Sequence, residues 1–250
     1  ELWEIPERGA YLDMAKGFQS KVGPLGDRWQ PMYQGIRDCN IFLENIGKVP
    51  DMQPEEKTRW ISEVKFLKAY YHFTLVRMYG PVPLIRTNLP VSADVNQVKV
   101  YRDPVDSCFN YISTLLDEAA AGLPETVISP ATEAGRVTKP IALTLKAKVL
   151  VTAASPLFNG NTDQSALKNP DGTQLFNTTY SQAKWDLAAV ACKQAIDACA
   201  AIGMKLYGYN PSFQQFVVSD TIKTQLSISG AVTGGWNSEI IWAKTLATTD

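Results

Sequence analysis

Residues 65–85, KFLKAYYHFTLVRMYGPVPLI, constrain the fold more than any other stretch of this chain. Apolar and aromatic side chains occur on nearly every side of a helix drawn through this stretch: Phe66, Leu67, Tyr70, Tyr71, Phe73, Leu75, Val76, Met78 and Tyr79. A helix that is apolar all round has to be covered by neighbours on several sides. Gly80 suits the left-handed position after a helix, and Pro81 and Pro83 prevent the helix from resuming. The sequence therefore predicts a core built from several helices.

Apolar periodicity and helix-ending residues predict five helices along the chain. Their expected bounds are about 30–46, 54–79, 104–121, 139–154 and 180–202. The loops between them at 84–103, 122–138 and 157–179 are long for simple connections. Loops of that length tend to carry function or docking surfaces.

Long helices that alternate with loops and pair as antiparallel neighbours indicate a mainly α fold. We expect a tetratricopeptide-like α-superhelix with long loops and a degenerate repeat. The composition changes after residue 204, and SEIIWAKTLATT at 238–249 alternates in the manner of a strand. A little strand is therefore expected near the C-terminal end.

Composition excludes several classes of function. Hydrophobic residues make up 45% of the chain and charged residues 20%, as in an ordinary globular protein. The net charge of -1 gives no reason to expect nucleic acid or an anionic membrane surface as a partner. His72 is the one histidine in the sequence, so a site that needs a histidine pair is excluded, and we expect neither metal nor cofactor. The four cysteines, which include no CxxC pair, are interpreted as buried free thiols.

Several separated passages resemble the SusD/RagB family and follow one another in the expected order. They are RWQPMYQGIRDCNIFLENI (28–46), EVKFLKAYYHFTLVRMYGPVPLI (63–85), YRDPVDSCFNYISTLLDEAAAGLP (101–124), GRVTKPIALTLKAKVLVTAASPLFNG (135–160) and WDLAAVACKQAIDACAAIGMKLY (185–207). Family members are nutrient-binding lipoproteins on the surface of Gram-negative bacteria, and they are usually about twice as long as this chain. By this resemblance, residues 1–250 form a single helical SusD-like domain. It lacks the family's lipidated amino-terminal segment and its carboxy-terminal half.

The resemblance implies a non-catalytic function at the outer surface of the outer membrane. The protein would bind a nutrient, often an oligosaccharide, and deliver it to a SusC-type TonB-dependent transporter. A lipid anchor that this chain does not contain would hold it at the membrane. The same transporter partnership with a peptide or other nutrient is an alternative, because fold does not fix the ligand. A tetratricopeptide-type adaptor is a weaker alternative, and an enzyme would need a catalytic motif or carboxylate pair that the sequence does not present.

A glycan site should combine exposed aromatic rings with fixed polar groups. Sugar rings present C–H faces that pack on aromatic rings, and sugar hydroxyls need hydrogen-bond partners. Aromatic and amide residues outside the expected helix cores are the candidates: Trp236, Asn237, Tyr209, Tyr207 and Trp3. Trp236 is the leading one because it follows Gly234 and Gly235 in a flexible, exposed context. The competing interpretation of Tyr207 and Tyr209 is packing at the edge of the domain.

Overall fold

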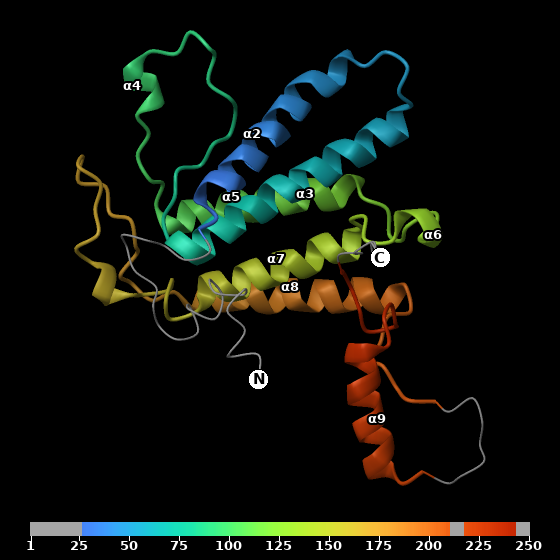
Figure 1. The fold of residues 1–250 in the computed structure, drawn as a ribbon. Helices are drawn as coiled ribbons and strands as arrows, with labels where there is room; N and C mark the ends of the chain where they lie inside the picture. The colour runs from blue at the N-terminus through green and yellow to red at the C-terminus, as the bar shows by residue number, and fades with distance from the viewer. Residues whose placement is uncertain (1–26, 211–217, 244–250) are drawn as a thin grey trace, which may run out of the picture.

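The computed structural model describes residues 27–210 and 218–243 of the chain (Figure 1). Its body consists of long helices, namely α2 (Trp29–Asn45), α3 (Pro54–Tyr79), α5 (Val105–Gly122), α7 (Lys139–Ala154) and α8 (Gln182–Ala201). Each of these packs on the next along the chain, α2 on α3, α3 on α5, α5 on α7 and α7 on α8. The predicted mainly α, superhelical fold is therefore confirmed.

The bounds of the long helices follow from local sequence signals. The expected bounds 54–79 and 139–154 coincide with α3 and α7, and the other three helices differ by one or two residues at each end. α3 begins with Pro54 at a position that needs no N–H donor, and it ends before Gly80 at φ 70°. None of the helices that the structure describes is both long and apolar enough to cross a membrane.

Shorter helices lie in the connections and in the C-terminal part. They are η3 (Ile46–Lys48), α4 (Val95–Val98), α6 (Pro130–Glu133), η4 (Thr162–Gln164) and α9 (Asp220–Thr233). The sequence did not indicate α9, because DTIKTQLSISGAVT is rich in serine, threonine and β-branched residues of low helix propensity. Ser219 nevertheless caps it, since its side chain accepts a hydrogen bond from the N–H of Ile222 at 3.4 Å.

The predicted C-terminal strand is wrong over the part of it that the structure describes, residues 238–243. The side-chain oxygen of Asn237 accepts from the N–H of Glu239 at 2.9 Å, and the N–H of Ile240 donates to the Asn237 carbonyl at 3.3 Å. These two bonds turn the backbone, which the alternation of side chains could not indicate. Residues 244–249 of the predicted strand lie outside the described residues.

Buried side chains of α2, α3, α5 and α7 form the main core. Phe66, Phe73, Ile112 and Leu116 are among its largest fully buried members. The loop after α7 closes one end of this core, because Phe158 lies against Phe109 at 5.0 Å between ring centroids. Together with Leu175 and Phe176, which are also buried, this contact makes the 157–179 loop in part a packing element.

Gly160 is a position where this loop permits no side chain. Its φ is +78°, and a Cβ built there would lie 2.9 Å from the backbone N and Cα of Tyr180. Gly172 has a similar φ of +88° but nothing within 4 Å of a Cβ. We expect Gly160→Ala to lower the free energy of unfolding by about 1–2 kcal/mol more than Gly172→Ala. Both substitutions strain the backbone, but only the alanine at position 160 also clashes with Tyr180.

Urea denaturation of the two glycine variants and the wild type measures this difference. Equal losses of stability in the two variants would contradict the close approach of Tyr180 to Gly160.

Candidate ligand-binding site

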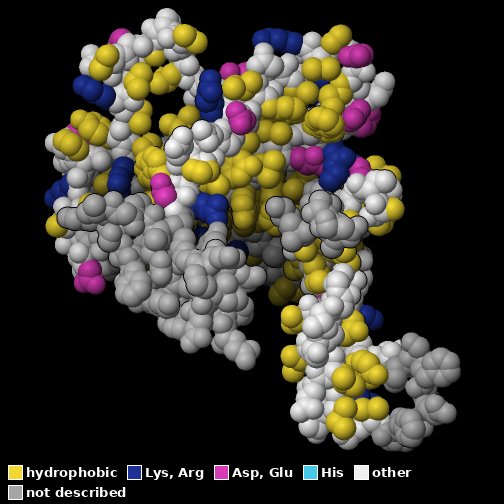
Figure 2. Space-filling view, viewed as in Figure 1, with side chains coloured by type: hydrophobic (Ala, Val, Ile, Leu, Met, Phe, Trp, Pro, Cys, Tyr) yellow, Lys and Arg dark blue, Asp and Glu magenta, His cyan; other side chains and the backbone are white. Residues whose placement is uncertain are grey.

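The site begins with an arm, which we define as residues 204–210 and 218–243, standing away from the helical body (Figure 1). Its outgoing and returning segments are joined where they leave the body. The N–H of Lys205 donates to the carbonyl of Ser238 at 3.0 Å, and the N–H of Tyr207 donates to a Glu239 carboxylate oxygen at 2.9 Å. Apolar side chains of α9 lie exposed along the arm, as Figure 2 shows.

Trp236 lies on the returning segment, beside a pocket of about 540 Å³ between the arm and the body. It directly follows Gly235, whose φ of +64° turns the chain, and 49% of its surface is exposed. Apolar side chains make up most of the walls of this pocket, the Trp236 pocket: Val127, Pro130, Ala131, Ala134, Pro140, Ile141, Ile202, Met204 and Ile241. Glu125, Thr126, Arg136 and Thr138 supply its polar groups.

Asn237 is next to Trp236, but its side chain is engaged within the arm. Its amide nitrogen donates to the carbonyl of Ala231 at 3.1 Å and to that of Gly235 at 3.4 Å. Its amide oxygen accepts from the backbone of Glu239. Asn237 therefore shapes the turn that carries Trp236.

Neither of the two tyrosine candidates lines the Trp236 pocket. Tyr207 lines a second pocket, together with side chains of α9. Its ring lies so close to Gly230 that a Cβ there would be 2.6 Å from Cε1. The N–H of Tyr209 donates to the Ser227 hydroxyl at 2.9 Å. Tyr207 thus packs against α9, and the backbone of Tyr209 is tied to α9 by this hydrogen bond. Trp3 lies outside the described residues.

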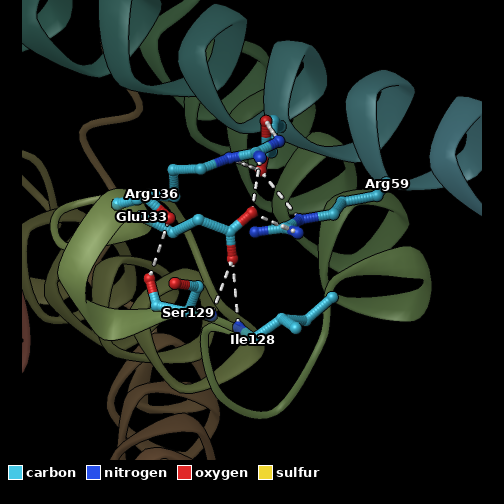
Figure 3. A network of polar contacts seen from close by, with 7 residues as sticks. Arg59, Ile128, Ser129, Glu133 and Arg136 are labelled. Atoms are coloured by element: carbon cyan, nitrogen blue, oxygen red, sulfur yellow. Dashed lines mark hydrogen bonds and ion pairs between the residues drawn. The ribbon is translucent and has the colours of Figure 1, made fainter.

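The loop 125–138 forms the opposite wall of the Trp236 pocket, and a network of charged residues ties it to α3 (Figure 3). Arg136 binds Glu63 through Nε at 3.1 Å and Nη2 at 3.0 Å, and it reaches Glu133 through Nη1 at 2.8 Å. Arg59 binds Glu63 at 3.2 Å and Glu133 at 2.9 Å. Sequence reasoning missed this network, although the i,i+3 spacing of Glu133 and Arg136 is a signal for their pair.

Two members of the network, Glu133 and Arg136, have pKa values shifted toward their charged forms. The hydrogen bond from Arg59, helped by the N–H groups of Ser129 and Ile128, lowers the pKa of Glu133 to about 2. The carboxylate of Glu63, which it binds with two nitrogens, raises the pKa of Arg136. These residues therefore stay ionised at any physiological pH.

Trp242 anchors the returning segment of the arm to the body. Its ring packs edge-on against Phe66 at 5.3 Å and Tyr70 at 5.7 Å between centroids. Its indole Nε1 donates to the carbonyl of Gly135 at 3.0 Å. Body, loop and arm thus meet at Trp242, six residues after Trp236 in the sequence.

The arrangement suits binding through an aromatic face and apolar walls. Trp236 can stack on a flat apolar ligand surface, and Glu125, Thr126 and Thr138 can pair with hydroxyl groups at the rim. Arg136 already directs Nε, Nη1 and Nη2 at carboxylates, so its role here is to hold the loop.

Comparisons with known proteins agree on one family. The family model SusD-like, described as starch-binding and associating with the outer membrane, matches residues 13–151. The curated SusD-like protein P25 of Formosa agariphila is 25% identical over 126 residues, which cover 50% of this chain and 23% of that protein.

Solved structures share the fold over most of the chain. The structure of BT4246 is 29% identical, with a TM-score of 0.75, over 90% of this chain and 40% of that one. A SusD-like protein from Bacteroides fragilis NCTC 9343 is 25% identical, with a TM-score of 0.52, over 72% of this chain and 27% of that one. The chain thus spans well under half the length of these relatives.

Proposed function

Because the chain belongs to the SusD-like family, we propose that it is part of a non-catalytic protein that binds glycans at the outer surface of the outer membrane. The bound glycan is handed to a SusC-type TonB-dependent transporter. The protein is held at that surface as a lipoprotein, by a lipid anchor. The match of residues 13–151 to a family described as starch-binding carries this proposal.

The Trp236 pocket is the proposed place of glycan contact. A half-exposed indole beside a pocket of about 540 Å³ supports this assignment, since that volume lies within the range of small-ligand sites. Trp236 stacks on the sugar ring, and Asn237 acts indirectly by fixing the turn below it. Tyr207 and Tyr209 act indirectly, through their contacts with α9.

A peptide or another nutrient in the same pocket is the second candidate. The apolar character of its walls favours it, because apolar side chains of a peptide would fill such a surface without leaving hydroxyls unpaired. The transporter partnership is the same in both proposals.

A parallel screen against a glycan array and a peptide library distinguishes the two ligands. We expect the purified chain to retain starch-derived or other oligosaccharides and to leave them uncleaved. Retention of peptides with a blank glycan array would replace the first proposal with the second. Release of shorter sugars during incubation would contradict a non-catalytic role.

Co-purification tests the partnership. The full-length protein, expressed with a SusC-type transporter in outer membranes, is expected to stay bound to it through detergent extraction. Separation of the two at low salt would contradict the proposed handover.

A further inference from the structure

The charge network behind the loop 125–138 is more buried than a surface ion-pair cluster. The side chains of Arg59, Glu63 and Glu133 are 12%, 18% and 16% exposed, and that of Arg136 is 33% exposed. Removal of one partner from such a buried set leaves the others with unpaired charge. The side chains of this network are therefore held in one arrangement more firmly than those of an exposed ion pair.

One carboxylate of this network fixes both ends of a short turn. Glu133 directs Oε1 at Arg59 and Arg136. Its Oε2 accepts from the N–H of Ile128 at 3.0 Å and from that of Ser129 at 3.4 Å. Figure 3 shows this carboxylate between the arginines and the backbone of the loop. The conformation of residues 128–136 thus depends on Glu133 and its arginines.

The turn ends in a contact with the arm. Gly135 lies between Glu133 and Arg136 and has a φ of +90°. Its carbonyl accepts the hydrogen bond from Trp242 Nε1 at 3.0 Å. Ile241, next to Trp242, packs on the main core and lines the Trp236 pocket. A continuous set of contacts therefore runs from α3 through the loop to the arm.

We propose that Glu133 and Arg136 are positioning residues, which set the Gly135 carbonyl that Trp242 binds and so fix where the arm places Trp236. This inference rests on the proposed function only where it concerns ligand affinity. The position of Trp236 is a property of the protein without ligand, and it can be measured separately.

Fluorine NMR of protein labelled with 5-fluorotryptophan measures that position. The chain has six tryptophans, and Trp236→Phe and Trp242→Phe assign the two relevant resonances. In Arg136→Ala and in Glu133→Ala, we expect the Trp236 and Trp242 resonances to move by more than their line widths. The resonance of Trp185, which lies on α8 outside the Trp236 pocket, should stay in place.

Lys193→Ala is the matched control. It also removes one positive charge, but Lys193 lies exposed on α8, where it pairs with Asp197 at 2.5 Å outside the Trp236 pocket. We expect the Trp236 and Trp242 resonances to be unchanged in this variant. Unchanged Trp236 and Trp242 resonances in Arg136→Ala would overturn the proposal.

Trp242→Phe tests the same link without disturbing the buried charges. It keeps an aromatic ring against Phe66 and Tyr70 and removes the donor to the Gly135 carbonyl. We expect the Trp236 resonance to move in this variant also, and a fixed resonance would overturn the proposed link even if Arg136→Ala failed to fold.

Titration with maltoheptaose, a starch oligomer, separates this proposal from the proposed function. We expect Arg136→Ala to weaken binding at least tenfold and Lys193→Ala to retain it. Absence of binding in the wild type, with the Trp236 resonance still moved by Arg136→Ala, would contradict starch-type glycan binding and leave the positioning role supported.

Discussion

Lowering the pH from 7 to 4 is expected to cost the folded protein about 3 kcal/mol through His72 alone. The ring is fully buried in α3, with Nδ1 at 2.8 Å from the Lys68 carbonyl. Burial, aided by the nearby charges of Lys68 and Arg86, lowers the pKa of His72 from 6.5 to about 4. The unfolded chain therefore takes up a proton below pH 6.5, whereas the folded protein does so only near pH 4. Stability falls as the pH passes through that window.

Urea denaturation at a series of pH values measures this loss, with His72→Leu as the comparison. Leucine keeps an apolar volume beside Tyr111, whose ring centroid lies 5.4 Å from that of the imidazole. The stability of the wild type should fall by about 3 kcal/mol more than that of the variant between pH 7 and pH 4. The contribution of Glu133 to stability is lost in a lower pH range. Its pKa is about 2 in the folded protein, so this contribution decreases only below pH 4.5. Parallel profiles for the two proteins would show that His72 does not cause the acid sensitivity.

Trp236→Ala is expected to weaken glycan binding at least tenfold, which corresponds to about 1.4 kcal/mol or more. Its indole forms the aromatic face of the Trp236 pocket, and truncation of a central aromatic contact commonly costs this much or more. Because 49% of Trp236 is exposed, the substitution should leave the melting temperature nearly unchanged. Calorimetric titration with the glycan selected on the array measures the change.

Trp185→Ala is the control for Trp236→Ala. Trp185 is 38% exposed and lies on α8, outside the lining of the Trp236 pocket. We expect it to bind the glycan with wild-type affinity. Equal affinity in all three proteins would contradict the assignment of Trp236.

The helical body could be predicted because its signals are local. The bounds of α3 and α7 follow from Pro54, Gly80, Pro140 and the apolar run of each helix. The resemblance to SusD/RagB proteins rests on these same helices, and the family comparison confirms it. The organisation of residues 1–250 as one domain stays a prediction.

The arm and the pocket wall depend on contacts between residues far apart in the sequence. Arg59 meets Glu133 across 74 positions, and Trp242 meets Gly135 across 107. Side-chain alternation predicted a strand after residue 237, but hydrogen bonds of Asn237 turn that backbone instead. The two glycines before Trp236 made it a candidate, but the sequence could not show that the loop 125–138 would face its indole.

The most direct test of glycan binding at Trp236 is a titration of the 5-fluorotryptophan-labelled wild type with the array-selected glycan, followed by fluorine NMR. Stacking of the glycan on Trp236 should give a saturable change in the Trp236 resonance, with the same dissociation constant as calorimetry and with the Trp185 resonance unmoved. Binding that saturates in calorimetry while the Trp236 resonance stays fixed would place the glycan elsewhere on the protein and contradict the assignment of Trp236.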